Sequence, residues 1–159
     1  MYDFEIGGAE CNFFGLTIIG YQYPNEPLEP SDDNPVDEFD TGRFLVIECH
    51  FVRNEVDWKR SGPFLSTDDL AKLRDWMVEL PLVTIGTVGC YFTERDLELS
   101  YDASRKALSI HASYELNSPV ERSGQTTTLV FRLDDSMIAS LVGQLENCIR
   151  RFPGRPNPV

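Results

Sequence analysis

Two stretches in the middle of the chain alternate apolar and polar residues, and a short turn joins them. The first, "DLELSY" at 96–101, places Leu97, Leu99 and Tyr101 on one side of an extended backbone. The turn "DASR" at 102–105 follows. The second stretch repeats the alternation with Leu108, Ile110, Ala112, Tyr114 and Leu116. Because alternation at period two decides which face of a strand is buried, the pattern predicts an antiparallel β-hairpin.

Further strands are expected on both sides of this hairpin. Residues 2–7 and 13–22 are rich in Phe, Ile and Tyr, and a Gly-Gly pair at 7–8 indicates a turn between them. In "RFLVIECHFVR" at 43–53, one face carries Leu45, Ile47, Cys49 and Phe51. Near the C-terminal end, "NSPVERSG" at 117–124 is typical of a loop and "TTTLVFRL" at 126–133 of a strand.

Two segments have the 3.6-residue period of amphipathic helices. The first covers 66–80, with Ser66 or Thr67 as the N-cap and Pro81 as the stop. Its apolar stripe is Leu70, Leu73, Trp76, Met77 and Leu80. The second helix begins at Asp134 or Asp135. Its apolar stripe is Ile138, Leu141, Val142, Leu145, Ile149 and Phe152.

The order of these elements is strands, helix, strands, helix, with short connections between successive strands. That order predicts an α+β fold: a mostly antiparallel β-sheet with two amphipathic helices packed on one face. A chain of 159 residues is most simply one domain. We expect that domain to cover 1–152, and residues 153–159, "PGRPNPV", to form a flexible C-terminal tail.

The segment "YPNEPLEPSDDNPVDEFDTG" at 23–42 is unlike the rest of the chain. It holds seven acidic residues, four prolines and no Lys or Arg. The chain has 26 acidic and 14 basic residues and a net charge of −12, so 19 acidic residues face 14 basic ones outside the segment. More than half of the net charge is therefore concentrated here. We expect residues 24–42 to form an acidic, proline-rich loop, either a solvated spacer or a surface that meets a partner.

The negative charge and the hydropathy restrict the partners and the compartment. Nucleic acid and anionic membranes are unfavourable partners, because their phosphate groups would be repelled. The longest strongly apolar run, "FFGLTII" at 13–19, is far shorter than the roughly 20 residues that span a bilayer. The first residues also lack the pattern of a secretory signal. We therefore expect a cytoplasmic protein whose four cysteines, Cys11, Cys49, Cys90 and Cys148, are reduced and buried.

Residues suited to catalysis or metal binding are scarce. The two histidines, His50 and His111, cannot assemble a histidine metal cluster, and the cysteines lack the spacing of zinc ligands. The sequence contains neither a G-x-S-x-G elbow nor a GxxxxGK[ST] loop. We predict no catalytic residue, no metal site and no cofactor, and therefore no enzyme. A Cys–His pair that meets only in the folded chain is the remaining catalytic alternative.

Trp58 has two interpretations. In "EVDWKR" at 55–60 it stands between charged residues, and tryptophan is enriched at the centres of protein interfaces. As an exposed side chain it would be a candidate anchor for a partner. As a strand residue opposite Val56, it would instead face the core.

Three stretches, in this order and spacing, resemble the bacterial WapI-type immunity protein family. They are "GYQYP" at 20–24, "FLSTDDLAKLRDWM" at 64–77 and "YFTERDLELSY" at 91–101. The similarity extends loosely to the C-terminal helix. The chain differs from the family pattern at two places: Arg43-Phe44 stands where members often have Asn-Trp, and Arg95 replaces a proline. These differences bear on which toxin is recognised more than on the fold.

The resemblance implies an antidote that binds the C-terminal domain of a cognate toxin, often a nuclease, and blocks it by occlusion. A nuclease surface is basic, so the acidic charge of this chain agrees in sign. The candidate partner-binding residues are Asp32, Asp33, Asp37, Glu38, Asp40 and Trp58. The alternative is a non-catalytic ligand-binding or scaffold module without a toxin partner.

Overall fold

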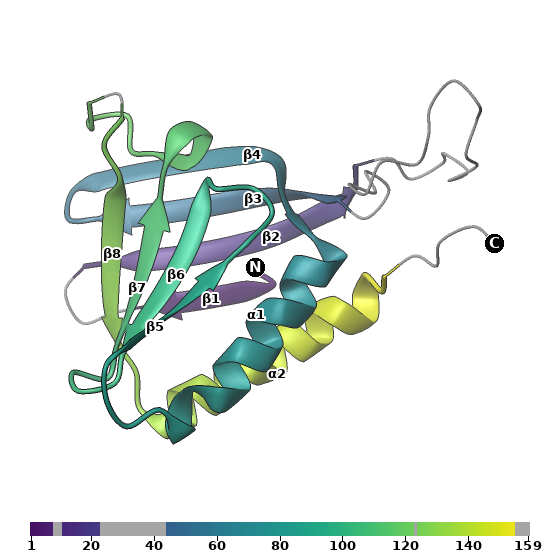
Figure 1. Cartoon of the computed structure of the whole chain (residues 1–159). Coiled ribbons are helices and arrows are strands. Elements are labelled where there is room, and N and C mark those ends of the chain that lie inside the picture. Colours follow the sequence, from purple (N-terminus) through teal and green to yellow (C-terminus); the bar gives the residue numbers. More distant parts are fainter. Residues whose placement is uncertain (8–10, 23–43, 123, 155–159) are drawn as a thin grey trace.

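The computed structural model describes residues 1–7, 11–22, 44–122 and 124–154. Within these residues the chain forms two four-stranded antiparallel sheets and a pair of long helices (Figure 1). The first sheet consists of β1 (Phe4–Gly7), β2 (Phe13–Tyr21), β3 (Phe44–Arg53) and β4 (Val56–Ser66). The second consists of β5 (Thr87–Tyr91), β6 (Leu97–Asp102), β7 (Ala107–Ala112) and β8 (Thr127–Arg132). In both sheets, neighbours in sequence are neighbours in space.

Each sheet is followed directly by a helix. β4 leads into α1 (Thr67–Glu79) and the 3-10 turn η2 (Leu80–Leu82), and β8 leads into α2 (Asp135–Arg151). The two helices lie side by side; α1 contacts β4 and β5, and α2 contacts β1 (Figure 1). The α+β class and the antiparallel pairing predicted from the sequence are confirmed. The strands are divided between two sheets: β4 is an edge strand of the first, and β5 is an edge strand of the second and pairs with β6.

The buried side chains of both sheets and both helices join in one hydrophobic cluster. In β3 the alternation is confirmed, since Leu45, Ile47, Cys49 and Phe51 are all fully buried. The centres of the helix stripes are confirmed. Four stripe residues are only partly buried at the margin of the cluster, and Cys148 completes the buried face of α2. The four are Trp76, Val142, Ile149 and Phe152. No helix in the described part of the chain is long and apolar enough to cross a membrane.

Local hydrogen bonds explain where the helices begin. Ser66 is the N-cap of α1: its Oγ accepts from the backbone N–H of Asp69 at 3.1 Å, and an Asp69 carboxylate oxygen accepts from the Ser66 N–H at 2.9 Å. This reciprocal pair is a capping box. Asp134 caps α2 by accepting from the Met137 N–H at 2.7 Å. Both starts agree with the predicted caps.

The predicted hairpin is confirmed up to Ala112. β6 and β7 pair from Leu97↔Ala112 to Asp102↔Ala107, and Asp102 Oδ1 accepts hydrogen bonds from Ser104 Oγ at 2.7 Å and Ser104 N at 3.0 Å within the turn. The expectation that the alternation continues through Tyr114 is wrong. Tyr114 has a φ of +50°, which ends the extended backbone and starts the 3-10 turn η3 (Tyr114–Leu116). Its side chain is exposed instead of buried.

Two segments predicted from composition are largely not among the residues that the structure describes. The acidic loop at 24–42 and most of the predicted tail at 153–159 lie outside the described residues. At the start of that tail, Tyr21 Oη donates a hydrogen bond to the Pro153 carbonyl at 2.7 Å, and the Tyr21 ring meets that of Phe152 edge to face.

Candidate functional site

The two histidines occupy separate polar faces. His50 lies on the first sheet, where Nδ1 is 2.5 Å from Tyr2 Oη and Nε2 is 2.6 Å from Asp57 Oδ1. His111 lies on the second sheet, where Nε2 is 3.0 Å from Ser100 Oγ and Nδ1 is 2.9 Å from Thr128 Oγ1. Burial lowers the pKa of His111, which favours the neutral ring.

Three of the four thiols are poor nucleophiles in the folded chain. Burial raises the pKa of Cys90 and of Cys148 to about 11 and that of Cys49 further still, so these three cysteines stay protonated near neutral pH. Cys11 is exposed, which corrects the expectation that all four cysteines are buried. Among the described residues, no group of three or more His, Cys, Asp or Glu side chains is arranged to hold a metal ion.

Trp58 lies in the core. Its ring stacks on that of Phe51, with 5.1 Å between ring centroids and 15° between ring planes, and only 4% of the residue is exposed. The indole Nε1 donates a hydrogen bond to the backbone carbonyl of Leu116 at 3.0 Å. Of the two interpretations offered by the sequence, the buried strand residue is therefore the one observed. Trp58 instead connects the first sheet to the segment that comes after β7.

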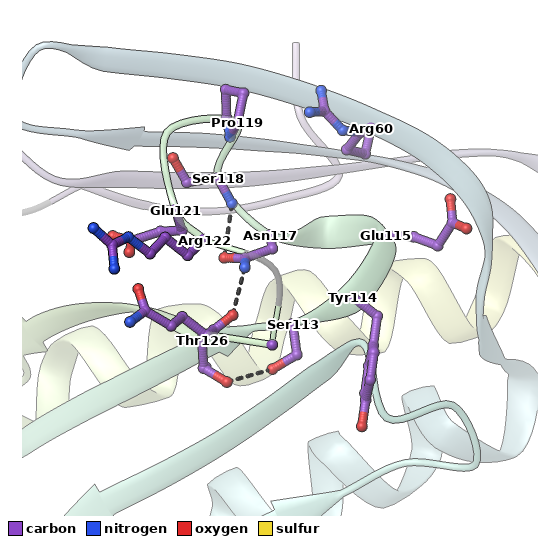
Figure 2. A pocket seen from close by; sticks show the side chains of 12 residues that line it. Arg60, Ser113, Tyr114, Glu115, Asn117, Ser118, Pro119, Glu121, Arg122 and Thr126 are labelled. Carbon is purple, nitrogen blue, oxygen red and sulfur yellow. Dashed lines mark hydrogen bonds between the residues drawn. The ribbon is translucent and has the colours of Figure 1, made fainter.

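That segment is the β7–β8 loop, of which the structure describes residues 113–122 and 124–126. Together with Arg60 of β4 it lines an open cavity of about 520 Å³ (Figure 2). Polar groups dominate the lining of this cavity. The lining includes Arg60, Tyr114, Glu115, Asn117, Glu121 and Arg122.

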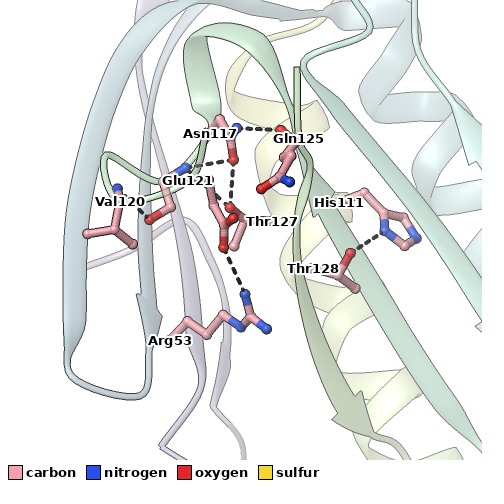
Figure 3. Close-up of polar contacts among 9 residues, drawn as sticks. Arg53, His111, Asn117, Val120, Glu121, Gln125, Thr127 and Thr128 are labelled. Atoms are coloured by element: carbon pink, nitrogen blue, oxygen red, sulfur yellow. Dashed lines mark hydrogen bonds and ion pairs between the residues drawn. The ribbon is translucent and has the colours of Figure 1, made fainter. Parts of the chain in front are cut away.

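Asn117 holds the two ends of the β7–β8 loop together (Figure 3). Its Oδ1 accepts from the Ser118 N–H at 2.9 Å and from Thr127 Oγ1 at 2.6 Å, and its Nδ2 donates to the Gln125 carbonyl. One amide side chain thus bonds to residues on both sides of the loop. Because Asn offers both a donor and an acceptor, no apolar or acidic residue could make the same three bonds.

The start of the loop is fixed to the second sheet. The carbonyl of Asp96 accepts from the Ser113 N–H at 2.9 Å, and the Asp96 carboxylate accepts from the Glu115 N–H at 3.0 Å. Across the loop, Ser113 Oγ and Thr126 Oγ1 are 2.8 Å apart. These bonds fix the backbone on both sides of Tyr114.

Contacts with the first sheet hold the middle of the loop. Besides the bond from Trp58 to Leu116, Arg53 Nη1 lies 3.5 Å from Glu121 Oε1 (Figure 3). The β7–β8 loop is therefore attached to both sheets. It is a preorganised surface loop. Hydrogen bonds of its backbone and side chains hold it in place, because it has no hydrophobic core of its own.

The loop displays apolar side chains to solvent. Tyr114 is 73% exposed and Val120 is 68% exposed, and Glu115 and Arg122 line the same cavity as Tyr114. In Figure 2 the ring of Tyr114 points away from the cavity, while Glu121 and Arg122 lie on its opposite side. An aromatic and an aliphatic side chain surrounded by charges is the composition of a protein-binding surface.

The sequence-predicted acidic residues are not part of this arrangement. Asp32, Asp33, Asp37, Glu38 and Asp40 lie outside the described residues. Conversely, sequence reasoning recognised 117–124 only as a loop and placed Tyr114 in the core. The sequence shows only a polar run between two strands at this place. Such a run does not indicate that Tyr114 adopts a positive φ.

The comparison with protein families gives a match over nearly the whole chain. The model of the immunity protein WapI-like family matches residues 5–153. The chain belongs to this family. Searches of curated proteins and of solved structures returned no match.

The three motifs that resemble the family, at 20–24, 64–77 and 91–101, contribute to the fold of the chain. Asp69, in the second motif, accepts hydrogen bonds from the backbone N–H and the hydroxyl of Thr93, in the third motif, each at 3.4 Å. Tyr21, in the first motif, contacts the chain after α2 through Phe152 and Pro153. Residues in these motifs thus join distant elements, whereas the exposed β7–β8 loop lies outside the three motifs.

Proposed function

We propose that this chain is an immunity protein that binds the C-terminal domain of a cognate bacterial toxin and neutralises it by occlusion. The observation that carries the proposal is the family match over residues 5–153. The site geometry supports a role without chemistry. Cys49, Cys90 and Cys148 are buried and protonated near neutral pH, so none of these three thiols is a thiolate nucleophile.

The charge of the chain supports a basic target. A net charge of −12 attracts a basic surface, such as the phosphate-binding surface of a nuclease, and repels nucleic acid itself. The chain then acts as a competitor for the surface that the toxin uses to hold its substrate. Its place of action is the cytoplasm of the producing cell, where the toxin would otherwise do damage.

The acidic segment has a kinetic role in this proposal. Complementary charge mainly accelerates encounter, up to about 10⁸–10⁹ M⁻¹s⁻¹ at low salt, while buried contacts determine how long the complex lasts. The prolines restrict the backbone, which reduces the entropy lost when the segment meets a partner. The steering residues are Asp32, Asp33, Asp37, Glu38 and Asp40.

Co-expression tests the proposal. The chain is produced in bacteria together with the C-terminal toxin domain encoded beside it, and growth is compared with cells that produce the toxin domain alone. We expect growth to be restored and the two proteins to be purified as one complex. A toxin domain that still kills and does not bind would show that the chain has another function, such as that of a scaffold module.

A further inference from the structure

We propose that the β7–β8 loop, residues 113–126, docks on the toxin domain, with Tyr114 as the anchor of the interface and Trp58 as a residue that positions the loop. This inference rests on the proposed function, because it names the surface that the toxin domain would meet. It is independent of the acidic segment. The contacts that support it come from both sheets and from the loop itself.

The β7–β8 loop is preorganised for binding. The side chains of Asn117, Asp96 and Trp58 bond to the loop backbone at Ser118, Gln125, Glu115 and Leu116. A loop that is already ordered loses little conformational entropy when a partner binds. Binding loops held on a rigid scaffold are the usual form of protein recognition sites.

The conformation of Tyr114 also favours a binding role. A φ of +50° is unfavourable for a residue with a bulky side chain. Cys11, Asn54 and Lys106 share this conformation. Cys11 lies in the connection between β1 and β2, and Asn54 and Lys106 lie in the tight turns of the β3–β4 and β6–β7 hairpins. Tyr114 lies in no such hairpin turn. The fold bears the strain and exposes the ring, and such outliers concentrate at functional sites.

The chemistry of the surface fits a protein segment. Tyr114 and Glu115 are consecutive and both exposed, so an aromatic ring and a carboxylate are available to lysine or arginine side chains of a basic partner. Arg60 and Arg122 line the same cavity and suit a carboxylate or a backbone carbonyl. A surface with both charges beside an aromatic ring can therefore bind a chain that carries donors and acceptors.

The test of the anchor uses two matched variants. Tyr114→Asn removes the ring and keeps the backbone conformation, because asparagine tolerates positive φ better than other side chains. Tyr91→Asn removes a second exposed tyrosine, on β5, which is 59% exposed. Titration calorimetry measures binding of each variant to the catalytically inactivated toxin domain. We expect the dissociation constant to rise about 30-fold or more for Tyr114→Asn and to change less than about threefold for Tyr91→Asn.

The test of Trp58 separates positioning from stability. Trp58→Phe keeps a ring against Phe51 and removes the bond to the Leu116 carbonyl, whereas Ile138→Val removes one buried methyl group from α2. We expect Trp58→Phe to raise the dissociation constant about tenfold and to increase hydrogen exchange at Glu115 and Asn117. Ile138→Val is expected to change neither. Equal affinities for the two variants would show that Trp58 serves only the fold.

The outcomes distinguish this inference from the proposed function. If the wild-type chain binds the toxin domain and Tyr114→Asn binds as tightly, the β7–β8 loop is not the docking surface and the proposed function stands. If the wild-type chain does not bind the toxin domain at all, both are wrong. Weaker binding by Tyr91→Asn, with Tyr114→Asn unchanged, would place the interface at β5 of the second sheet and overturn the inference.

Discussion

Replacing Asp69 by alanine is expected to lower the free energy of unfolding by about 3 kcal/mol. Asp69 is 5% exposed at the first turn of α1. Its carboxylate accepts hydrogen bonds from the Ser66 N–H, the Thr93 N–H and the Thr93 hydroxyl. It therefore connects the start of α1 to the segment between β5 and β6. These two segments carry two of the three motifs that resemble the family.

The magnitude follows from the groups that lose a partner. Loss of the capping contribution costs about 1 kcal/mol. The Ser66 N–H then lacks its acceptor in a residue that is 5% exposed, and an unsatisfied buried donor costs about 1–3 kcal/mol, of which we take about 2. The bonds to Thr93 are long, at 3.4 Å, and Thr93 is exposed, so water replaces them and their loss adds little. For a chain of this size, about 3 kcal/mol corresponds to a decrease in Tm of roughly 6–12 °C.

Urea denaturation followed by circular dichroism measures the effect. The matched control is Asp75→Ala, which removes an exposed carboxylate on the same helix, 2.6 Å from Arg74. Exposed ion pairs contribute at most about 1 kcal/mol, so this variant is expected to be nearly as stable as the wild type. If Asp69→Ala and Asp75→Ala have the same midpoint, the connection between the two motifs does not stabilise the fold.

Three further predictions use other groups. Iodoacetamide should label Cys11 alone in the folded protein, because Cys49, Cys90 and Cys148 are buried. Mass spectrometry should then find one adduct, and several adducts before unfolding would contradict the burial of these three cysteines. Stability should fall as the pH drops below about 6.5, because burial lowers the pKa of His111 and the unfolded chain binds that proton first. His111→Gln should reduce this loss in the range below about pH 6.5, and an unchanged pH profile would exclude His111 as its source. Changing five acidic residues of the 24–42 segment to Asn and Gln should slow association with the toxin domain and weaken the dependence of the association rate on salt, with stability nearly unchanged. Stopped-flow measurements test this, and unaltered kinetics would make the segment a spacer. These residues are Asp32, Asp33, Asp37, Glu38 and Asp40.

The parts of the fold that could be predicted depend on local patterns. The alternation in β3, the β6–β7 hairpin and the cap at Asp134 are each encoded within a short run of neighbouring residues. The division into two sheets is not local. The alternating pattern of a strand shows which face is buried, but it does not specify which strand is its partner, so the pairing of β5 with β6 and not with β4 is not encoded locally.

The candidate site was harder to predict for the same reason. The bond from Trp58 to Leu116 joins residues 58 positions apart, and nothing near Trp58 in the sequence indicates its acceptor. Tyr114 continues the apolar alternation of β7, so the pattern predicts burial. The structure exposes it because bonds from Asp96 hold the neighbouring backbone out of the strand. The acidic segment was visible from composition alone.

The most direct test of occlusion is a titration of toxin activity with the purified chain. Occlusion predicts that activity falls linearly to zero at one equivalent, that the loss is reversed when the complex is dissociated, and that the mass of the toxin domain does not change. Inactivation by much less than one equivalent, with a lasting change in the mass of the toxin domain, would contradict occlusion and show that the chain is an enzyme.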